Sequence, residues 1–220
     1  MLIIFDIDGT LCDTHDVDAR CHVAAVEAVT GRSLATVDWS LYPEATSSAI
    51  VHDLLKNMGI PDVVETEQRI YDDFVARLNV EARQRPEQFR PLDGGLELFE
   101  QLRQREEHSI AIATGDWQES AKLKLRLSGY KADDVPFASS SDTRRRVDII
   151  TLAAQRAGYA LVDSVYVGDG VWDVKAAREI NIRFVGVGRR HELLRQQGAA
   201  HVMPTFADRA LFFSALRNIQ

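Results

Sequence analysis

Four apolar residues, Leu2 to Phe5, run directly into two aspartates, Asp6 and Asp8, which lie one residue apart in the stretch LIIFDIDGTLCDT. A short apolar run of this kind is typical of a buried strand. Carboxylates at the end of a buried strand are costly to desolvate unless a cation or a hydrogen bond compensates them. The pair therefore requires a compensating partner elsewhere in the chain.

Short apolar runs alternate with longer stretches of helical period along most of the 220 residues. This alternation predicts βα units and an α/β fold whose core is a Rossmann-like parallel sheet. The chain is long enough for such a core together with a smaller domain. We expect strands at Leu2–Phe5, Ser109–Ala113, Val135–Ala138, Ser164–Val167, Arg183–Val187 and His201–Met203.

The segment 15–88 departs from this alternation. It contains no convincing strand, and the sequence RPLDGG that follows it, with a proline and two glycines, marks a return to the sheet. We therefore predict an inserted small α-helical cap domain, residues 15–88, within a core domain made of residues 1–14 and 89–220. The apolar residues of the insert recur at helical spacing in three stripes, which are Val23, Val26 and Val29; Ile50, Leu54 and Leu55; and Ile70, Phe74 and Leu78.

The composition argues against two classes of partner. The net charge is −7 and the basic residues are scattered, apart from a run at Arg144 to Arg146, so the basic face of a nucleic-acid-binding protein is missing. No segment approaches the roughly 20 apolar residues that a membrane span requires. Cys12 and Cys21 lack the CxxC spacing and are interpreted as reduced thiols. We expect a cytoplasmic protein, a monomer or a homodimer, that binds neither nucleic acid nor membranes.

Three of the predicted strands end in polar turns that contain glycine: FDIDGT, ATGD and VGDGVWD. Ligands of open parallel α/β sheets bind beyond the carboxyl ends of the strands, so we expect these turns to meet at one site. Asp6, Asp8, Asp169 and Asp173 would then converge and repel one another strongly unless a divalent cation neutralised them. Ligation by oxygen atoms alone favours Mg²⁺.

The second turn supplies complementary chemistry. The Thr114 hydroxyl and the backbone N–H groups from Gly115 onward lie at the start of a predicted helix, where an anion is stabilised. We therefore expect one site that holds a cation and a phosphate together.

These turns resemble, in their order and spacing, the motifs of the haloacid dehalogenase-like (HAD) hydrolase superfamily. The matching elements are DIDGT at residues 6–10, IATG at 112–115 and GDGVWD at 168–173. The resemblance is to the phosphatase branch, which includes phosphoglycolate phosphatase and β-phosphoglucomutase-like proteins, and it covers nearly the whole chain. The predicted helical insert resembles the cap that this branch carries between its first and second motifs.

The resemblance implies a role for each acidic residue. Asp6 would be the nucleophile that forms an aspartyl-phosphate, and Asp8 the general acid that then becomes the general base. Mg²⁺ would bind Asp6, the backbone carbonyl of Asp8, and Asp169, while Asp173 would hold the metal shell in place. The dehalogenases that resemble this fold lack an acid at the position of Asp8, so Asp8 argues for phosphoryl transfer.

The third motif departs from the common pattern of the superfamily, which has a lysine at the start of the helix before the last motif. Here the stretch reads SDTRRRVDII, and counting back from Asp148 places Arg144 at the lysine position. We expect Arg144 to act in catalysis, and either Arg144 or Arg146 to bind phosphate as a permanent bidentate cation. Lys124 is a weaker candidate because it lies about two turns into its predicted helix.

Several other residues receive weaker predictions. Arg20 is expected to bind substrate from the cap, and Thr46 could face the substrate as well. Asp13 is expected to organise its turn. The remaining candidates are assigned no function: His15, His22 and His52 are taken as surface or helix residues, and Trp117 and Trp172 as packing residues.

The leading hypothesis is a Mg²⁺-dependent phosphatase that acts on a small phosphorylated metabolite. Two alternatives stay open. One is a phosphomutase of the β-phosphoglucomutase type, and the other is a metabolite-binding or regulatory protein on the same fold, which the unusual third motif favours. In this architecture the core supplies the chemistry and the cap the selectivity, so the motifs leave the substrate unidentified.

Overall fold

The computed structural model describes residues 1–34 and 38–218. Its core is a six-stranded sheet in the order β3-β2-β1-β4-β5-β6, in which every neighbouring pair of strands is parallel. This arrangement confirms the predicted α/β class with a Rossmann-like parallel sheet. The strands are β1 (Leu2–Phe5), β2 (Ser109–Ala113), β3 (Phe137–Ala138), β4 (Ser164–Gly168), β5 (Arg183–Val187) and β6 (His201–Met203).

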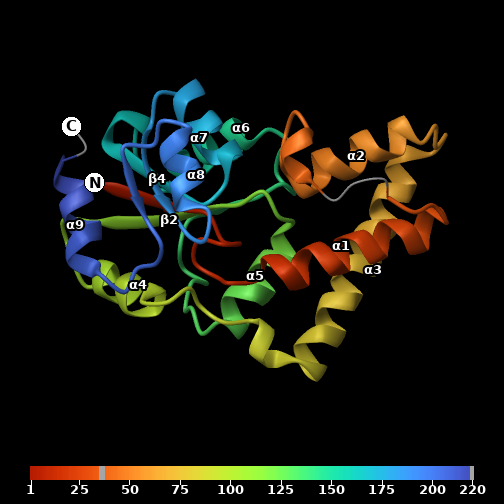
Figure 1. Ribbon diagram of the computed structural model, residues 1–220, viewed down its shortest axis with the longest axis horizontal. Helices are drawn as coiled ribbons and strands as arrows, with labels where there is room; N and C mark the ends of the chain where they lie inside the picture. The colour runs from red at the N-terminus through yellow and green to blue at the C-terminus, as the bar shows by residue number, and fades with distance from the viewer. Residues whose placement is uncertain (35–37, 219–220) are drawn as a thin grey trace.

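Helices cover both faces of the sheet (Figure 1). Successive side chains of a strand point to opposite faces, so β1 contributes to two separate cores. Ile3 and Phe5 pack with helices on one face, and Leu2 and Ile4 with helices on the other. The face with Ile3 and Phe5 carries α4 (Gly95–Arg103), α5 (Gln118–Leu127) and α9 (Arg209–Asn218). The opposite face carries α6 (Arg146–Arg156) and α7 (Val171–Glu179). Helix α8 (His191–Gln196) packs beside β5 and β6, and the 3₁₀ helix η3 (Leu161–Asp163) precedes β4.

A second body, built from helices, lies beside the sheet body (Figure 1). Its elements are α1 (His15–Thr30), η1 (Trp39–Leu41), α2 (Ser47–Asn57), α3 (Val63–Gln84) and η2 (Pro86–Gln88), here called the helical body. The predicted apolar stripes of α2 and α3 meet in its core with Val26 of α1. No strand occurs among its described residues, which agrees with the helical pattern of the sequence.

Helix α5 joins the two bodies. Leu123 and the preceding Trp117 pack in the core of the helical body, whereas Ala121 and Leu125 pack in the core of the sheet body. The backbone adds a direct link, because the amide of Ser47 donates to the carbonyl of Gly115 at 2.7 Å. The side chains of α5 therefore lie at the junction of the two bodies.

Strand β3 is shorter than the sequence predicted. The expected strand began at Val135, but the structure begins it at Phe137. Val135 closes a turn by donating its amide to Ala132, and Pro136 has no N–H to contribute to a ladder. Strand β4, in contrast, extends one residue beyond the prediction, to Gly168.

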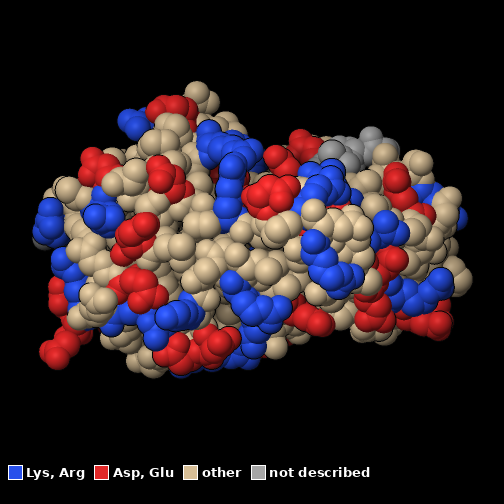
Figure 2. Space-filling view, turned by 90° about the horizontal axis from the view of Figure 1, so that it is seen from below, with Lys and Arg blue, Asp and Glu red and all other residues tan. Residues whose placement is uncertain are grey.

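The structure also describes the helix hydropathy, the cysteines and the surface charge of the chain. No helix among the described residues has the length and apolar character needed to cross a membrane. Both cysteines, Cys12 and Cys21, are free thiols buried within the fold. On the face seen in Figure 2, acidic and basic side chains are intermixed across the surface.

Phe5 is the best single test of the sheet body's core. It is fully buried, and its ring lies 6.2 to 6.4 Å from the rings of Phe99, Phe206 and Phe212. We expect Phe5→Ala to lower the free energy of unfolding by about 3 to 5 kcal/mol, because it removes buried apolar surface and leaves a cavity. Urea unfolding measures the change, and Val64→Ala is the control, because Val64 is 77% exposed. Equal unfolding midpoints for the two variants would contradict this account of the core.

Candidate active site

The strand order brings the three polar turns together. Strands β2, β1 and β4 are neighbours, so the residues that follow them meet at one edge of the sheet. There they border a cavity of about 390 Å³ that also contacts the helical body. The sheet body contributes Asp6, Asp8, Thr114, Gly115, Arg146 and Asp169 to its lining.

Asp6 lies at the base of this cavity and is 4% exposed. Burial, together with the charges of Asp173 and Asp169, raises the pKa of its carboxyl well above the ordinary value, although Arg146 opposes the shift. A terminal nitrogen of Arg146 lies 3.7 Å from Asp6 Oδ1. The ionised carboxylate of Asp6 therefore requires additional positive charge nearby.

Arg146 is the cation that the structure brings to this carboxylate. Its guanidinium donates to Asp173 Oδ1 at 2.9 Å and to the hydroxyl of Tyr166 at 3.2 Å. A second terminal nitrogen donates to the carbonyl of Ala45, in the helical body, at 2.7 Å. Gly115 permits this position, because a Cβ there would lie 2.2 Å from Arg146. The guanidinium is thus fixed between the two bodies, beside Asp6.

Asp173 is completely buried and fully hydrogen bonded. Its Oδ1 accepts from Tyr166 at 2.8 Å in addition to Arg146, and its Oδ2 accepts from the backbone amides of Asp169 and Gly170 at 3.1 and 2.9 Å. These bonds tie the start of α7 to the end of β4. Asp173 therefore holds Arg146 and the Asp169 turn in position, and it has no lone pair directed freely into the cavity.

Asp169 combines one paired oxygen with one unpaired oxygen. Its Oδ2 lies 2.8 Å from His15 Nε2, whereas Oδ1 is buried without a hydrogen-bond partner. Burial lowers the pKa of His15, but the hydrogen bond and charge of Asp169 outweigh it and raise that pKa to about 9. Gly9 makes this approach possible: its φ is +77°, and a Cβ would lie 2.4 Å from both partners.

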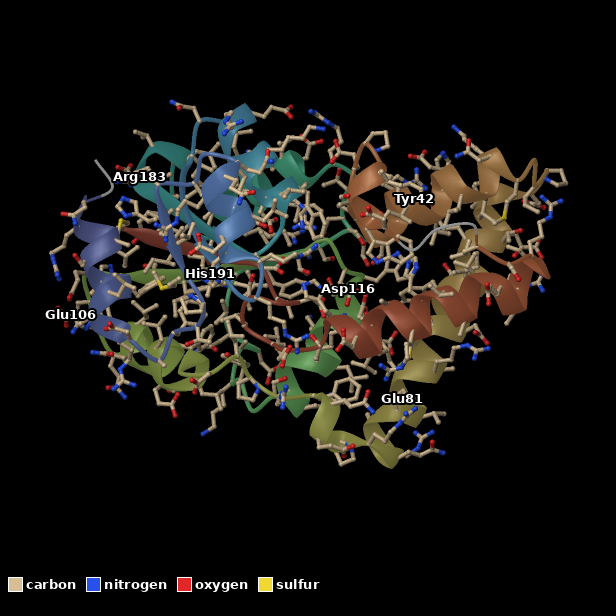
Figure 3. The ribbon with its side chains drawn as sticks, viewed as in Figure 1. Tyr42, Glu81, Glu106, Asp116, Arg183 and His191 are labelled. Carbon is tan, nitrogen blue, oxygen red and sulfur yellow. The ribbon has the colours of Figure 1, made fainter. Side chains whose placement is uncertain are left out.

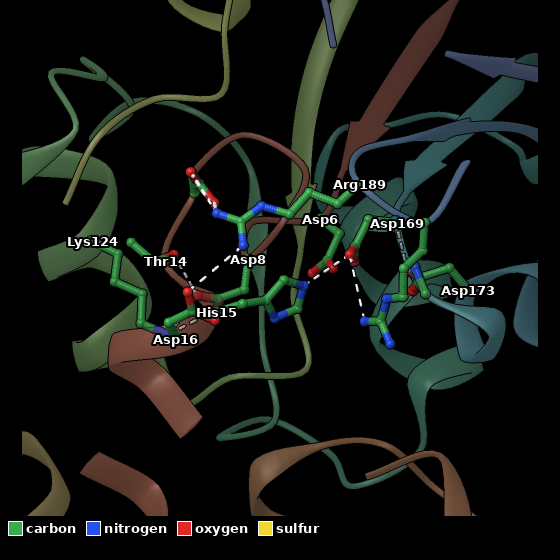
Figure 4. A network of polar contacts seen from close by, with 12 residues as sticks. Asp6, Asp8, Thr14, His15, Asp16, Lys124, Asp169, Asp173 and Arg189 are labelled. Atoms are coloured by element: carbon green, nitrogen blue, oxygen red, sulfur yellow. Dashed lines mark hydrogen bonds and ion pairs between the residues drawn. The ribbon is translucent and has the colours of Figure 1, made fainter. Parts of the chain in front are cut away.

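The carboxylate of Asp8 points away from Asp6 (Figure 4). It accepts from the Thr14 hydroxyl at 2.6 Å, and both of its oxygens lie 2.9 Å from Lys124 Nζ. Lys124 and Thr14, together with His15, lower the pKa of Asp8 although its burial acts in the opposite direction. Asp8 is therefore held ionised beside the helical body.

Lys124 is completely buried and forms ion pairs with three carboxylates. Besides Asp8 it contacts Asp18 of α1 and, at 2.8 Å, Asp116. Burial lowers the pKa of Lys124, but the three carboxylates raise it well above its ordinary value. Figure 3 shows Asp116 where the sheet body and the helical body meet. One ammonium group thus links the polar turns of the sheet to the first helix of the helical body.

Among the residues that the structure describes, two groups of carboxylates could hold a cation. One is Asp6, Asp169 and Asp173, whose oxygens lie within 4.8 Å of one another. The other is Asp8, Asp18 and Asp116, where the ammonium group of Lys124 already supplies the positive charge. The unpaired oxygen of Asp169 and the raised pKa of Asp6 fit a divalent cation at the first group.

The turn after β2 fits a phosphate. Thr114 is buried and lines the cavity, and its oxygen accepts the amide of Asp116 at 3.2 Å, so its hydroxyl proton is available for another acceptor. Gly115 lines the cavity next to it. Both residues lie where the sequence predicted them, beside Asp6 and Arg146.

Arg144 is not brought to the cavity, which corrects the prediction for this residue. Its side chain is 48% exposed and pairs with Glu67 of α3 at 2.8 Å. Thr46 accounts for this position, because its hydroxyl donates to the Arg144 carbonyl at 2.7 Å and fixes the backbone there. Two residues later, at the start of α6, the chain turns Arg146 inward.

Two residues of the helical body also lie away from the cavity. Arg20 donates to Gln88 and to the carbonyl of Asp16 and does not line the cavity. Thr46 caps α2 and bonds Arg144, as described above. Neither is placed to contact a ligand at Asp6.

The structure also places in or beside the site several residues that the sequence analysis set aside. Lys124 contacts Asp8, His15 contacts Asp169, and His22 and Trp172 line the cavity. A partial signal for Lys124 was present, since it lies in α5 between two leucines, Leu123 and Leu125, and a lysine that is buried there needs a charged partner. His15 gave no such signal, because its partner Asp169 lies far away in the sequence.

Asp116 allows a test of the Lys124 cluster. Burial raises its pKa from 3.8 to about 6, although Lys124 opposes the shift. A raised carboxyl pKa gives stability that is present below pH 3.8 and is lost as the pH rises through about 6. We expect Asp116→Asn to remove this dependence, so that the stability of the variant relative to the parent increases between pH 4 and 7. Chemical unfolding across this range measures it, and a constant difference would contradict the charge balance described here.

Comparisons with known proteins agree with this geometry. Residues 3–187 match the family model for haloacid dehalogenase-like hydrolases. No curated protein shows a significant match to the chain.

Solved structures provide the second comparison. A hydrolase from Pseudomonas syringae has a TM-score of 0.75 at 22% identity, covering 96% of this chain and 97% of that one. β-Phosphoglucomutase from Clostridium difficile has a TM-score of 0.74 at 16% identity, with coverage of 99% and 98%. CbbY from Rhodobacter sphaeroides, in complex with phosphate, has a TM-score of 0.73 at 19% identity, with coverage of 94% and 95%. Since the family model spans most of the chain, this protein belongs to the haloacid dehalogenase-like hydrolases.

Proposed function

We propose that this protein is a Mg²⁺-dependent phosphatase that hydrolyses a small phosphorylated metabolite through an aspartyl-phosphate on Asp6. The observation that carries the proposal is the placement of Asp6 at the base of the cavity, with Arg146 3.7 Å away and Thr114 and Gly115 lining the same space. In this proposal Asp6 is the nucleophile, Arg146 is the permanent cation, and Thr114 and Gly115 are the hydrogen-bond donors around the phosphate.

The reaction uses the carboxylates in two steps. An oxygen of Asp6 attacks phosphorus, the bond between phosphorus and the ester oxygen breaks, and the departing alkoxide takes a proton from Asp8. Asp8 then accepts a proton from water as that water attacks the phosphorus of the aspartyl-phosphate, which releases phosphate and regenerates Asp6. Two easier displacements replace one difficult hydrolysis.

Asp8 must leave Lys124 to perform this role. In the structure its carboxylate is paired with the ammonium group and held ionised, which suits a base but not an acid. We infer that the helical body acts as the cap, and that its movement, transmitted through Asp18 and Lys124, frees Asp8 to turn toward Asp6. Closure would also exclude water from the cavity during phosphoryl transfer.

Positive charge would come from two sources. Arg146 and the donors at Thr114 and Gly115 would hold the phosphate oxygens. Asp6 and Asp169 would be the side-chain ligands of Mg²⁺, with the Asp8 carbonyl, while Asp173 supports this arrangement through its four hydrogen bonds. When bound, Mg²⁺ would neutralise charge on the phosphate and its neighbouring carboxylates.

Asp6→Asn tests the nucleophile. We expect the variant to lose Mg²⁺-dependent hydrolysis of p-nitrophenyl phosphate by at least about a thousandfold, because an amide cannot form the acyl phosphate. The parent protein should lose activity on chelation with EDTA and regain it with Mg²⁺. Release of phosphate by Asp6→Asn at the parental rate would refute the mechanism.

Arg146 and Arg144 form a matched pair for the third motif. Arg146→Met should reduce kcat/KM by at least about a hundredfold, because it removes the cation beside Asp6 and leaves Asp173 without its cationic partner. Arg144→Met should change kcat/KM by less than about threefold, since it removes an exposed ion pair with Glu67. Steady-state kinetics of both variants decide the assignment, and the reverse order of effects would restore Arg144 to the site.

The two alternative functions, a non-catalytic binding protein and a phosphomutase, differ in how well the site geometry supports them. The non-catalytic alternative rests on the unusual third motif, and the position of Arg146, 3.7 Å from Asp6, supports the proposal that Arg146 is the cation of that motif. The phosphomutase alternative stays open, since β-phosphoglucomutase from Clostridium difficile shares the fold of this chain and a mutase would use the same proposed nucleophile. Free phosphate produced without an isomerised sugar phosphate would distinguish the phosphatase from the mutase.

A further inference from the structure

Among the described residues, the wall that the helical body contributes to the cavity has one cationic side chain, His15 of α1, and Asp169 already pairs with it at 2.8 Å. The wall also presents two carboxylates from α1, Asp16 and Asp18, together with His22, Trp39 and Ile50. The other cations that line the cavity, among the described residues, are Arg146, Arg189 and Arg190, and all three belong to the sheet body. The part of a substrate that faces the helical body therefore meets acidic, aromatic and apolar groups.

The arginines at the mouth of the cavity are already paired. Arg189 donates to both oxygens of Asp13, at 2.7 and 3.0 Å, and lies 3.6 Å from Asp16. Arg190 lies 3.7 Å from Asp169 and 5.1 Å from the ring of Trp172. Lys124 is shared among three carboxylates, so its cluster carries an excess of negative charge. A second anionic group on the substrate would meet repulsion here rather than a partner.

His22 is the polar group of this wall that lacks a partner. It is 3% exposed, and neither of its ring nitrogens has a hydrogen-bond partner. Its ring stacks on Trp117 with centroids 5.6 Å apart and meets Trp39 and Phe74 edge-on at 5.2 and 5.6 Å. The neutral imidazole offers one donor and one acceptor in a fixed orientation, and leaving both unsatisfied is costly.

We propose that His22 is a specificity-determining residue that hydrogen-bonds a hydroxyl group of the leaving alcohol. The inference rests on the proposed phosphatase function and narrows its substrate class to phosphate esters of uncharged, hydroxylated alcohols. A leaving group with a carboxylate or a second phosphate is excluded by the acidic wall. The same property disfavours a phosphomutase, which must accommodate a bisphosphate.

A set of three-carbon esters tests the substrate class. Glycerol 1-phosphate carries two hydroxyls, propyl phosphate carries none, and 3-phosphoglycerate replaces one hydroxymethyl group with a carboxylate. We expect kcat/KM for glycerol 1-phosphate to exceed that of each of the other two by at least about tenfold. Values within threefold for glycerol 1-phosphate and 3-phosphoglycerate would overturn the exclusion of anions.

Substitutions at position 22 test the residue. His22→Phe keeps an aromatic ring in the stack but removes both nitrogens, and it should reduce the preference for glycerol 1-phosphate over propyl phosphate by at least about tenfold. His22→Gln retains a donor and an acceptor and should keep part of that preference. His52→Leu is the control, because His52 lies near Glu67 and does not line the cavity. Thermal unfolding verifies that each variant is folded, and an undiminished preference in folded His22→Phe would overturn the assignment.

A charge placed on the wall tests the exclusion independently. Ser47 is the first residue of α2 and lines the cavity. Ser47→Arg should raise kcat/KM for 3-phosphoglycerate relative to glycerol 1-phosphate by at least about fivefold, whereas the uncharged Ser47→Gln should not. Equal effects of the two variants would count against the electrostatic explanation.

The assays separate this inference from the proposed function. Hydrolysis of p-nitrophenyl phosphate together with indifference to the three esters would overturn the inference and leave the phosphatase function standing. Absence of Mg²⁺-dependent hydrolysis of every ester would overturn both.

Discussion

The structure depends on the compensation of buried carboxylates by two buried cations. Asp6, Asp169 and Asp173 lie at the carboxyl edge of the sheet, where Arg146 is, among the described residues, the cation close enough to offset the charge of Asp6 and Asp173. Asp8 is compensated separately, by Lys124. Breaking either arrangement would leave a charge stranded in a region of low polarity, which costs more than most packing changes. The carboxylates at the sheet edge therefore constrain the positions of α5 and α6, which carry Lys124 and Arg146.

The two cations also tie the helical body to the sheet body. Arg146 donates to the carbonyl of Ala45, and Lys124 contacts Asp18 of α1. The positions of Arg146 and Lys124, which lie near the proposed phosphate position, therefore depend on the position of the helical body. In the proposed mechanism, closure and catalysis are therefore linked, because a displacement of α1 would change the partners available to Lys124 and hence to Asp8.

Much of the fold and part of the site could be predicted from local sequence. The apolar runs of β1, β2 and β4 and the polar turns after them are continuous in the sequence, and a parallel sheet must bring such turns to one edge. Asp6, Asp169, Thr114 and Gly115 were accordingly predicted beside one cavity, where the structure places them. The shortened β3 was missed because the prediction gave too little weight to the missing N–H of Pro136.

By itself, the sequence determined the parallel sheet, the helical insert and the gathering of acidic residues, because these follow from periodicity and from the order of strands and turns. Only the tertiary structure decided which cations serve those acids. Counting from Asp148 favoured Arg144, but the bond from Thr46 to the Arg144 carbonyl and the turn into α6 direct Arg146 inward instead. Lys124 and His22 were likewise placed by packing between elements distant in the chain. The identity of a buried partner depends on where side chains converge in space, and spacing along one chain does not specify that convergence.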